Sequence, residues 1–125
     1  MPKKVLIIDD DQVVLFIQKK MVVKSGLAET TTEFSNPVEA LEYVKNDSTN
    51  DFLLLLDIKM PEMSGWDFLD AAQNLPNINK IKVVMVSSSI DEKDHAKAKE
   101  YDQVIGYMEK PLDITKCQTI ASLLG

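Results

Sequence analysis

At residues 52–57 the chain reads FLLLLD, five apolar residues in succession that stop at a carboxylate. A strand without polar alternation is typical of a parallel sheet that is covered by helices on both faces. Three further apolar runs, 5–8, 83–86 and 104–108, also stop at polar residues, and segments of helix length separate the runs. The pattern therefore predicts an α/β protein with a buried parallel sheet.

The composition is typical of a soluble globular protein with one domain. The chain has 125 residues, of which 45% are hydrophobic and 27% are charged. Its net charge is −6 and it contains no long basic run, which argues against binding to nucleic acid. No apolar stretch approaches the roughly 20 residues of a membrane span, and the N-terminal apolar run is too short for a signal peptide. The single cysteine, Cys117, cannot form an internal disulfide, which suits a reducing compartment. Together with the net charge and the lack of a membrane span, this leads us to expect a cytoplasmic protein without membrane or nucleic-acid partners.

Strands and helices are expected to alternate along the whole chain. The expected strands are 4–8, 28–34, 52–56, 81–86 and 104–108. The expected helices are 11–24, one that begins at Pro37, 65–74, 91–101 and 113–124. These elements predict a flavodoxin-like, doubly wound sheet of five parallel strands in the order 2-1-3-4-5, with five helices. The second strand is polar and suits a sheet edge, and the polar fourth helix should be weakly anchored and suited to a partner surface.

Polar side chains follow the central strands at the points where these strands end. Asp9 and Asp10 follow the first strand, Asp57 follows the third, Ser87 follows the fourth, and Lys110 lies just beyond the fifth. Because ligands bind at the carboxyl ends of the strands in an open parallel sheet, we expect these side chains to converge on one crevice. Crowded carboxylates repel one another, and oxygen ligands in a small site suit Mg²⁺ together with a phosphoryl group.

Several other polar or aromatic residues have simpler interpretations. Asp11 is expected to cap the following helix, which should stop near Gly26. His95 lies on a strongly charged helix, where we expect solvent exposure rather than a ligand role. Cys117 is most simply a small buried residue. Trp66 is either a partly exposed helix residue or a fluorescent reporter of the nearby Asp57 site.

The chain resembles the receiver domain of two-component response regulators, in the stand-alone form typified by the chemotaxis regulator. The resemblance covers essentially all of residues 1–125. It rests on IDDD at 8–11, LDIKMP at 56–61 with the following SG at 64–65, VSS at 86–88 and KP at 110–111. Each motif alone is weak, but all four in order at these spacings are specific to the family.

The resemblance implies a role for each residue of the crevice. Asp57 would accept a phosphoryl group from the phosphohistidine of a histidine kinase. Asp10 would bind Mg²⁺ directly, with Mn²⁺ as a possible substitute, and Asp9 would assist, often through water. Asp57 and the backbone carbonyl of Lys59 would complete the protein ligands of the metal. The ammonium of Lys110 would meet the phosphoryl oxygens, as a flexible point charge can.

The resemblance also implies a conformational switch. Ser87 occupies the family's Ser or Thr position, and Tyr107 occupies the position of an aromatic residue that rotates inward. Phosphorylation would then change the face formed by the fourth helix, the fifth strand and the fifth helix. The alternative for Tyr107 is a half-buried strand residue with a solvated hydroxyl. Lys59 and Ser89 lie where the family adjusts the lifetime of the acyl phosphate, and the family has a cis peptide before the equivalent of Pro111.

The implied protein is a stand-alone response regulator and not an enzyme. It would accept phosphate from a sensor histidine kinase or a histidine phosphotransfer protein. We expect no output domain beyond the last helix, so the output would be contact with a protein target that the sequence does not identify. The alternatives within this class are a phosphorelay intermediate, a phosphate sink, or a receiver that acts without phosphorylation.

Two other classes of protein share parts of this pattern. A phosphatase of haloacid-dehalogenase type would need a second aspartate two residues after the nucleophile, where this chain has Lys59. A flavodoxin would need a phosphate loop rich in Ser, Thr and Gly after the first strand, where residues 9–11 are acidic and would repel phosphate. Both classes therefore fit the sequence less well than a receiver domain.

Overall fold

The computed structural model describes residues 4–89 and 91–125. The strands are β1 (Lys4–Ile8), β2 (Thr32–Phe34), β3 (Phe52–Leu56), β4 (Ile81–Ser87) and β5 (Val104–Glu109). The helices are α1 (Gln12–Ser25), α2 (Pro37–Lys45), α3 (Gly65–Ala72), α4 (Glu92–Ala98) and α5 (Ile114–Leu124), and a short 3₁₀ turn, η1 (Ile78–Lys80), precedes β4. All strand pairs are parallel and their order is β2-β1-β3-β4-β5, which confirms the predicted topology.

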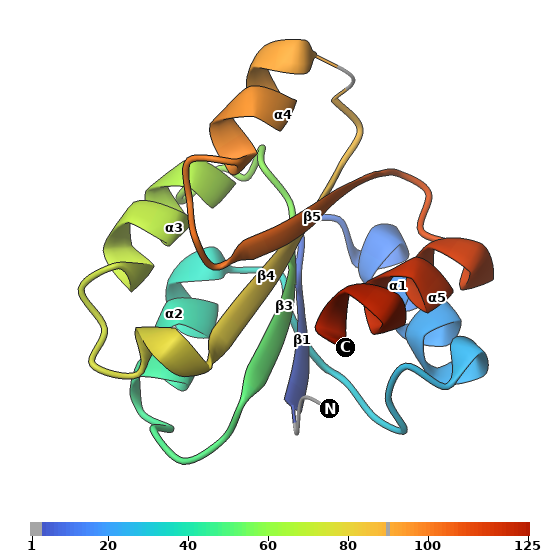
Figure 1. The fold of residues 1–125 in the computed structure, drawn as a ribbon, viewed down its shortest axis with the longest axis horizontal. Coiled ribbons are helices and arrows are strands. Elements are labelled where there is room, and N and C mark those ends of the chain that lie inside the picture. Colours follow the sequence, from blue (N-terminus) through green and yellow to red (C-terminus); the bar gives the residue numbers. More distant parts are fainter. Residues whose placement is uncertain (1–3, 90) are drawn as a thin grey trace.

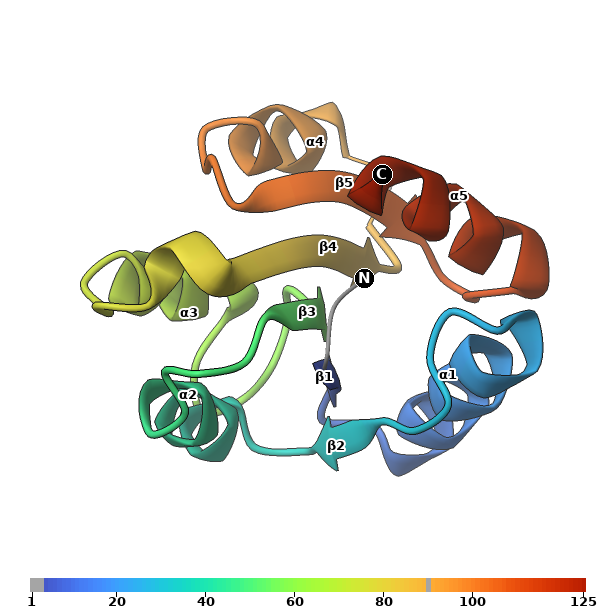
Figure 2. The same ribbon diagram turned by 60° about the horizontal axis from the view of Figure 1, so that its bottom comes forward.

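The sheet is the middle of three layers (Figures 1 and 2). Helices α1 and α5 cover one face, and α2, α3 and α4 cover the other. Strand β3 lies at the centre and all five of its residues are buried. Phe52, Leu54 and Leu56 belong to the core beneath α2, α3 and α4, whereas Leu53 and Leu55 belong to the core beneath α1 and α5. The FLLLL run is apolar throughout because its alternating side chains enter two different cores.

Two elements are much shorter than the sequence predicts, β2 and α4. β2 was expected over 28–34 but contains only Thr32–Phe34, because this edge strand pairs with β1 alone and the pairing begins opposite Leu6. α4 was expected over 91–101 but ends at Ala98. Each of the three N–H groups after Ala98 donates to the carbonyl three residues earlier, so the chain leaves the α-helix in a tighter turn. Among the residues of α4, all of which the structure describes, only Ala98 is buried, in keeping with the expected weak anchoring.

The predicted starts of the first two helices and the predicted stop of the first are confirmed. Asp11 Oδ1 accepts a hydrogen bond from the N–H of Val13 at 2.9 Å, and Asn36 Oδ1 accepts one from the N–H of Val38 at 2.9 Å. Gly26 ends α1 with a φ of +82°, a conformation that glycine adopts without the steric cost of a Cβ. No helix within residues 4–89 and 91–125 combines the length and the apolar character that crossing a membrane requires.

Gly65 allows α3 to begin directly against the backbone of residue 57. Its N–H donates to the carbonyl oxygen of Ile58 at 2.8 Å, and a Cβ at this position would collide with the backbone carbonyl oxygen of Asp57. A backbone atom cannot yield as a flexible side chain can. The absence of a side chain at Gly65 therefore helps to fix the loop that carries Asp57.

We predict that Gly65→Ala lowers the free energy of unfolding by about 1–3 kcal/mol, as an overpacked site does. Urea unfolding would measure this change. Gly106→Ala is the matched control, because its added Cβ would meet only the tip of the Leu123 side chain, at 3.0 Å, and Val84 at 4.0 Å. Equal stability losses in the two variants would contradict the assigned role of Gly65.

Candidate functional site

The carboxyl ends of β1, β3, β4 and β5 bring the predicted site residues together. Asp9 and Asp57 are buried, with 1% and 6% of their surfaces exposed, whereas Asp10 is exposed. Each of these three residues offers a carboxylate oxygen, and these oxygens lie within 4.8 Å of one another. The parallel register explains this proximity, because Ile8 lies opposite Leu56 and the acidic residues follow both.

Lys110 connects the two buried carboxylates. Its Nζ lies 2.6 Å from Asp9 Oδ2 and 3.3 Å from Asp57 Oδ2. Its backbone N–H donates to the carbonyl oxygen of Ser87 at 2.8 Å, and the Lys110-Pro111 peptide is cis, as in the family. Burial lowers the pKa of Lys110, but its close contact with Asp9 and the charges of Asp57 and Asp9 raise it more, so the pKa lies above its ordinary value. Lys110 therefore stays charged near neutral pH.

Asp57 lies at the point of strongest electrostatic conflict. Its N–H donates to the carbonyl of Ile8 at 3.1 Å, and its Oδ1 accepts a hydrogen bond from the N–H of Ile58 at 2.8 Å. Burial and then the charge of Asp9 raise the pKa of Asp57 to about 6, although Lys110 and the Ile58 N–H act in the opposite direction. One ammonium thus balances two buried carboxylates incompletely, and the crevice retains excess negative charge.

The residues present fit a hard divalent cation. Asp9 Oδ1 accepts a hydrogen bond from the N–H of Asp11 at 2.9 Å. Asp9 Oδ2 is also buried, and within residues 4–89 and 91–125 no hydrogen bond of good geometry reaches it, so the Lys110 charge is its main compensation. Carboxylate oxygens in such a cluster are the ligands that Mg²⁺ prefers. A hollow beside the cluster is lined in part by Asp10 and Lys59. The use of the Lys59 carbonyl as a ligand stays a prediction.

The two predicted switch residues meet at the loop between β4 and α4. Ser87 is buried at the end of β4, and its Oγ accepts a hydrogen bond from the N–H of Ser89 at 3.1 Å. Tyr107 is half-buried on β5, and its hydroxyl donates to the carbonyl oxygen of Ser89 at 3.1 Å. The Tyr107 hydroxyl therefore has a hydrogen-bond partner within the chain. This differs from the alternative, in which the hydroxyl would contact only solvent.

The expectation of a solvent-exposed His95 holds only in part. His95 is half-buried, and its ring centroid lies 3.9 Å from that of Tyr107 with an interplanar angle of 34°. α4 has few large apolar residues, so the imidazole provides part of its contact with the sheet. This contact was missed because a histidine on a charged helix carries no periodic signal of burial. Cys117 is buried, as expected.

Trp66, on α3, packs against Tyr101 and Lys97. It is half-buried, its ring stacks on that of Tyr101 at 6.0 Å with an interplanar angle of 15°, and Lys97 Nζ lies 5.3 Å from its centroid. The Tyr101 hydroxyl donates to Asp70 Oδ1 at 2.7 Å. These contacts join α3 to the turn that follows α4, and no motif in the sequence indicated them.

Comparison with known proteins gives relatives along the whole chain. A model of the response regulator receiver domain matches residues 5–122. The polar-differentiation response regulator DivK of Brucella anthropi is 26% identical over 126 residues, which cover 100% of this chain and 98% of that protein. An uncharacterized response regulatory protein of Staphylococcus epidermidis is 30% identical over 122 residues, which cover 97% of this chain and 46% of that protein.

A longer relative matches over part of its length. A protein-glutamate methylesterase/protein-glutamine glutaminase of Saccharophagus degradans is 36% identical over 87 residues, which are 70% of this chain but only 24% of that protein. The chain thus spans about a quarter of this relative.

Solved structures share the fold. The two component response regulator of Cytophaga hutchinsonii superposes with a TM-score of 0.86 and 27% identity, covering 97% of this chain and 96% of its own. The response regulator receiver protein of Dyadobacter fermentans gives a TM-score of 0.85 and 27% identity, covering 97% of both chains. These similarities agree with the predicted fold class.

The raised pKa of Asp57 predicts a pH-dependent cost to stability in the absence of metal. The pKa rises from 3.8 to about 6 on folding, so the protonated carboxyl favours the folded state below pH 3.8. This contribution is lost as the pH rises through about 6. At pH 7 Asp57→Asn should therefore raise the free energy of unfolding by about 1–3 kcal/mol. The gain should shrink towards zero near pH 4, as urea unfolding in EDTA would show.

Asp47→Asn is the control of opposite sign for this measurement. Hydrogen bonds from Asn50 and then Lys4 hold the pKa of Asp47 well below its ordinary value. Removing this carboxylate should therefore lower stability at pH 7. A destabilising Asp57→Asn at pH 7 would show that the crevice does not carry the uncompensated charge assigned to it.

Proposed function

The chain belongs to the response regulator receiver domain family, and from this we propose that it is a stand-alone response regulator whose Asp57 accepts a phosphoryl group from a phosphohistidine. The donor would be a sensor histidine kinase or a histidine phosphotransfer protein. The observation that carries the proposal is the buried Asp57 carboxylate beside the Lys110 ammonium, with the oxygens of Asp9 and Asp10 close by. The buried Cys117 supports a cytoplasmic location, because a lone thiol suits a reducing compartment.

Phosphoryl transfer needs positioning and charge compensation rather than covalent assistance from other protein groups. A carboxylate oxygen of Asp57 would form the new bond to phosphorus while the bond from phosphorus to the histidine nitrogen breaks, and that nitrogen keeps the bonding electron pair. Lys110 would offset charge on the transferring oxygens. Mg²⁺, held by Asp10, Asp9 and Asp57 with the carbonyl of Lys59, would supply further charge compensation when bound.

The same residues support a protein that is phosphorylated rather than an enzyme that acts on other molecules. The residue two positions after Asp57 is the exposed Lys59, so the general acid of a haloacid-dehalogenase phosphatase is missing from that position. The methylesterase name belongs to a relative of which this chain spans 24%. A phosphorelay intermediate or a phosphate sink would use the same chemistry and remains the alternative to direct output.

The proposed signal leads from Asp57 to the face formed by α4, β5 and α5. Phosphorylation adds charge and acceptor oxygens, and the Ser87 hydroxyl is placed to turn towards one of them. Tyr107 would respond through the loop that both residues contact. Moving a state from about 1% to about 99% populated takes roughly 5.5 kcal/mol. Two or three charge-assisted hydrogen bonds of about 1.5–3 kcal/mol each would be enough. The target would be a protein of unidentified type.

Metal removal and Lys110→Ala test this chemistry. With Mg²⁺ and acetyl phosphate the parent protein should gain one phosphoryl mass, and EDTA should abolish the gain. Amide hydrogen exchange at equal phosphorylation measures how much phosphorylation changes the protection of α4 and β5. In Lys110→Ala this change should be at least tenfold smaller than in the parent. Lys116→Ala is the matched control. Within residues 4–89 and 91–125 its Nζ bonds the backbone carbonyls of Glu109 and Pro111 and no carboxylate of the crevice. Metal-independent phosphorylation would contradict the proposed site.

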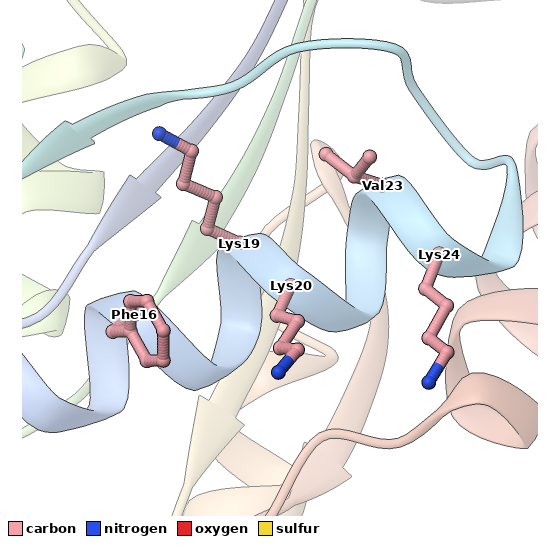
Figure 3. A pocket seen from close by; sticks show the side chains of 5 residues that line it. All are labelled: Phe16, Lys19, Lys20, Val23 and Lys24. Carbon is pink, nitrogen blue, oxygen red and sulfur yellow. The ribbon is translucent and has the colours of Figure 1, made fainter.

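The exposed face of α1 is the surface proposed for docking of the phosphodonor. Val13 and Phe16 are each 65% exposed, and α1 has three lysines and no acidic residue. Figure 3 shows the five residues that line a hollow on this helix, which are Phe16, Lys19, Lys20, Val23 and Lys24. Because α1 begins just after Asp9 and Asp10, a protein bound here could also reach the crevice. Its complementary surface would be an acidic helix with an apolar stripe.

Phe16→Ala separates docking from chemistry. We expect transfer from a protein phosphodonor to slow at least tenfold, because the aromatic anchor is lost. Phosphorylation by acetyl phosphate should stay within twofold of the parent, since this small donor needs no docking surface. Val38→Ala, which removes an exposed apolar side chain from α2, is the control and should leave both rates unchanged. Parallel slowing with both donors in Phe16→Ala would argue against a docking role.

A further inference from the structure

Ser89 has hydrogen bonds to both switch residues through its backbone. Its N–H donates to Ser87 Oγ, and its carbonyl oxygen accepts from the Tyr107 hydroxyl, each at 3.1 Å. Ser87 belongs to the phosphorylation crevice, while Tyr107 lies on the surface of β5. The loop between β4 and α4 thus connects the crevice to that surface at one residue.

The side chain of Ser89 makes a different set of contacts, all of them with the start of α4. Its hydroxyl donates to Asp94 Oδ2 at 2.6 Å and accepts from the N–H of Asp91 at 3.2 Å. Asp91 is the residue that caps α4, and Asp94 lies in its first turn. A hydroxyl bound to a carboxylate is a charge-assisted hydrogen bond, which is shorter and stronger than a neutral one.

These side-chain contacts matter because α4 has little other attachment. Ala98 is its one buried residue, with every residue of α4 described by the structure. Ser89 holds the first turn of α4, whereas the contacts of His95 with Tyr107 and of Lys97 with Trp66 lie towards its last turn. Figure 1 shows α4 at the outer edge of the molecule, beside β5. A displacement of Ser89 would therefore be passed to α4 with little resistance from packing.

We propose that Ser89 is a positioning residue whose hydroxyl makes α4 follow the movements of Ser87 and Tyr107. The inference rests on the proposed phosphorylation of Asp57 and adds the step from the loop to the helix. Any residue except proline at position 89 would keep the backbone N–H and carbonyl contacts. Only serine or threonine could also supply a hydroxyl at this point that binds both Asp94 and the N–H of Asp91. The side chain, rather than the loop backbone, therefore couples α4 to the crevice.

Ser88 offers a matched control for Ser89. It is exposed, it is the neighbouring residue of the same loop, and within residues 4–89 and 91–125 its hydroxyl makes no hydrogen bond that the structure records. Ser88→Ala and Ser89→Ala remove the same atom from adjacent positions. A general effect of altering the loop would appear in both variants, whereas the proposed coupling belongs to Ser89 alone.

The test measures phosphorylation and the α4 response separately in the full chain. Parent, Ser89→Ala, Ser89→Thr and Ser88→Ala proteins would be treated with Mg²⁺ and acetyl phosphate. Intact mass gives phosphoryl uptake, and amide hydrogen exchange gives the ratio of α4 protection with and without phosphorylation. Compared at equal phosphoryl occupancy, the α4 protection ratio of Ser89→Ala should lie at least fivefold closer to one than that of the parent. Ser89→Thr and Ser88→Ala should retain the parent ratio.

Asp94→Ala provides a second route to the same result. It removes the other partner of the hydroxyl bond, so it should also bring the α4 ratio towards one. The double variant Ser89→Ala with Asp94→Ala should be no worse than Ser89→Ala, because the same bond is already absent. Additive losses would overturn the proposal, and Asp94→Ala keeps it testable if Ser89→Ala folds poorly.

Each remaining outcome has a defined meaning. The coupling role would be overturned if phosphorylation changed the α4 protection of Ser89→Ala as much as that of the parent. It would also be overturned if α4 of Ser89→Ala exchanged faster both with and without phosphorylation while the ratio of the two stayed that of the parent. Loss of phosphoryl uptake in Ser89→Ala alone would also overturn it, since the residue would then act on the chemistry. Failure of the parent to take up phosphate would instead contradict the proposed function, and this result is separate from the others.

Discussion

The ammonium of Lys110 holds together two buried carboxylates, and the rest of the site depends on this incomplete balance. Its Nζ lies 2.6 Å from Asp9 and 3.3 Å from Asp57. Two negative charges against one positive charge leave Asp57 with a pKa of about 6, raised by burial and then by Asp9. A fold optimised only for stability would not keep such a pair. A site that binds a divalent cation has reason to keep it, because the cation offsets the excess negative charge.

Much of this arrangement follows from the sequence because it depends on strand order. A buried run such as residues 52–56 specifies a central parallel strand, and the carboxyl ends of such strands meet at one edge. Asp9, Asp57 and Lys110 are therefore brought together by topology alone. The contacts of Ser89 with Tyr107 and of His95 with Tyr107 depend on side-chain packing between distant segments. No periodicity or spacing encodes that packing, so these contacts required the structure.

The molecule divides into a rigid part that holds the crevice and a lightly attached part that can respond. The rigid part is the sheet with a core on each face, where strand β3 is completely buried. The responsive part is α4, which turns out to be shorter than the sequence predicts and has Ala98 as its one buried residue among Glu92–Ala98, all described by the structure. A few kcal/mol released in the crevice can reposition such a helix but could not reorganise the sheet. The weak anchoring that makes α4 hard to predict is thus the property that suits it to signalling.

The central claim is that Asp57 takes the phosphoryl group from a phosphohistidine. The most direct measurement is incubation with a histidine phosphotransfer protein that carries labelled phosphate on histidine, in the presence of Mg²⁺, followed by peptide mapping of the product. We expect a label that alkali and hydroxylamine release, on the peptide that contains Asp57, and no label on the Asp57→Asn variant. Label on another residue, or undiminished label on Asp57→Asn, would contradict the account.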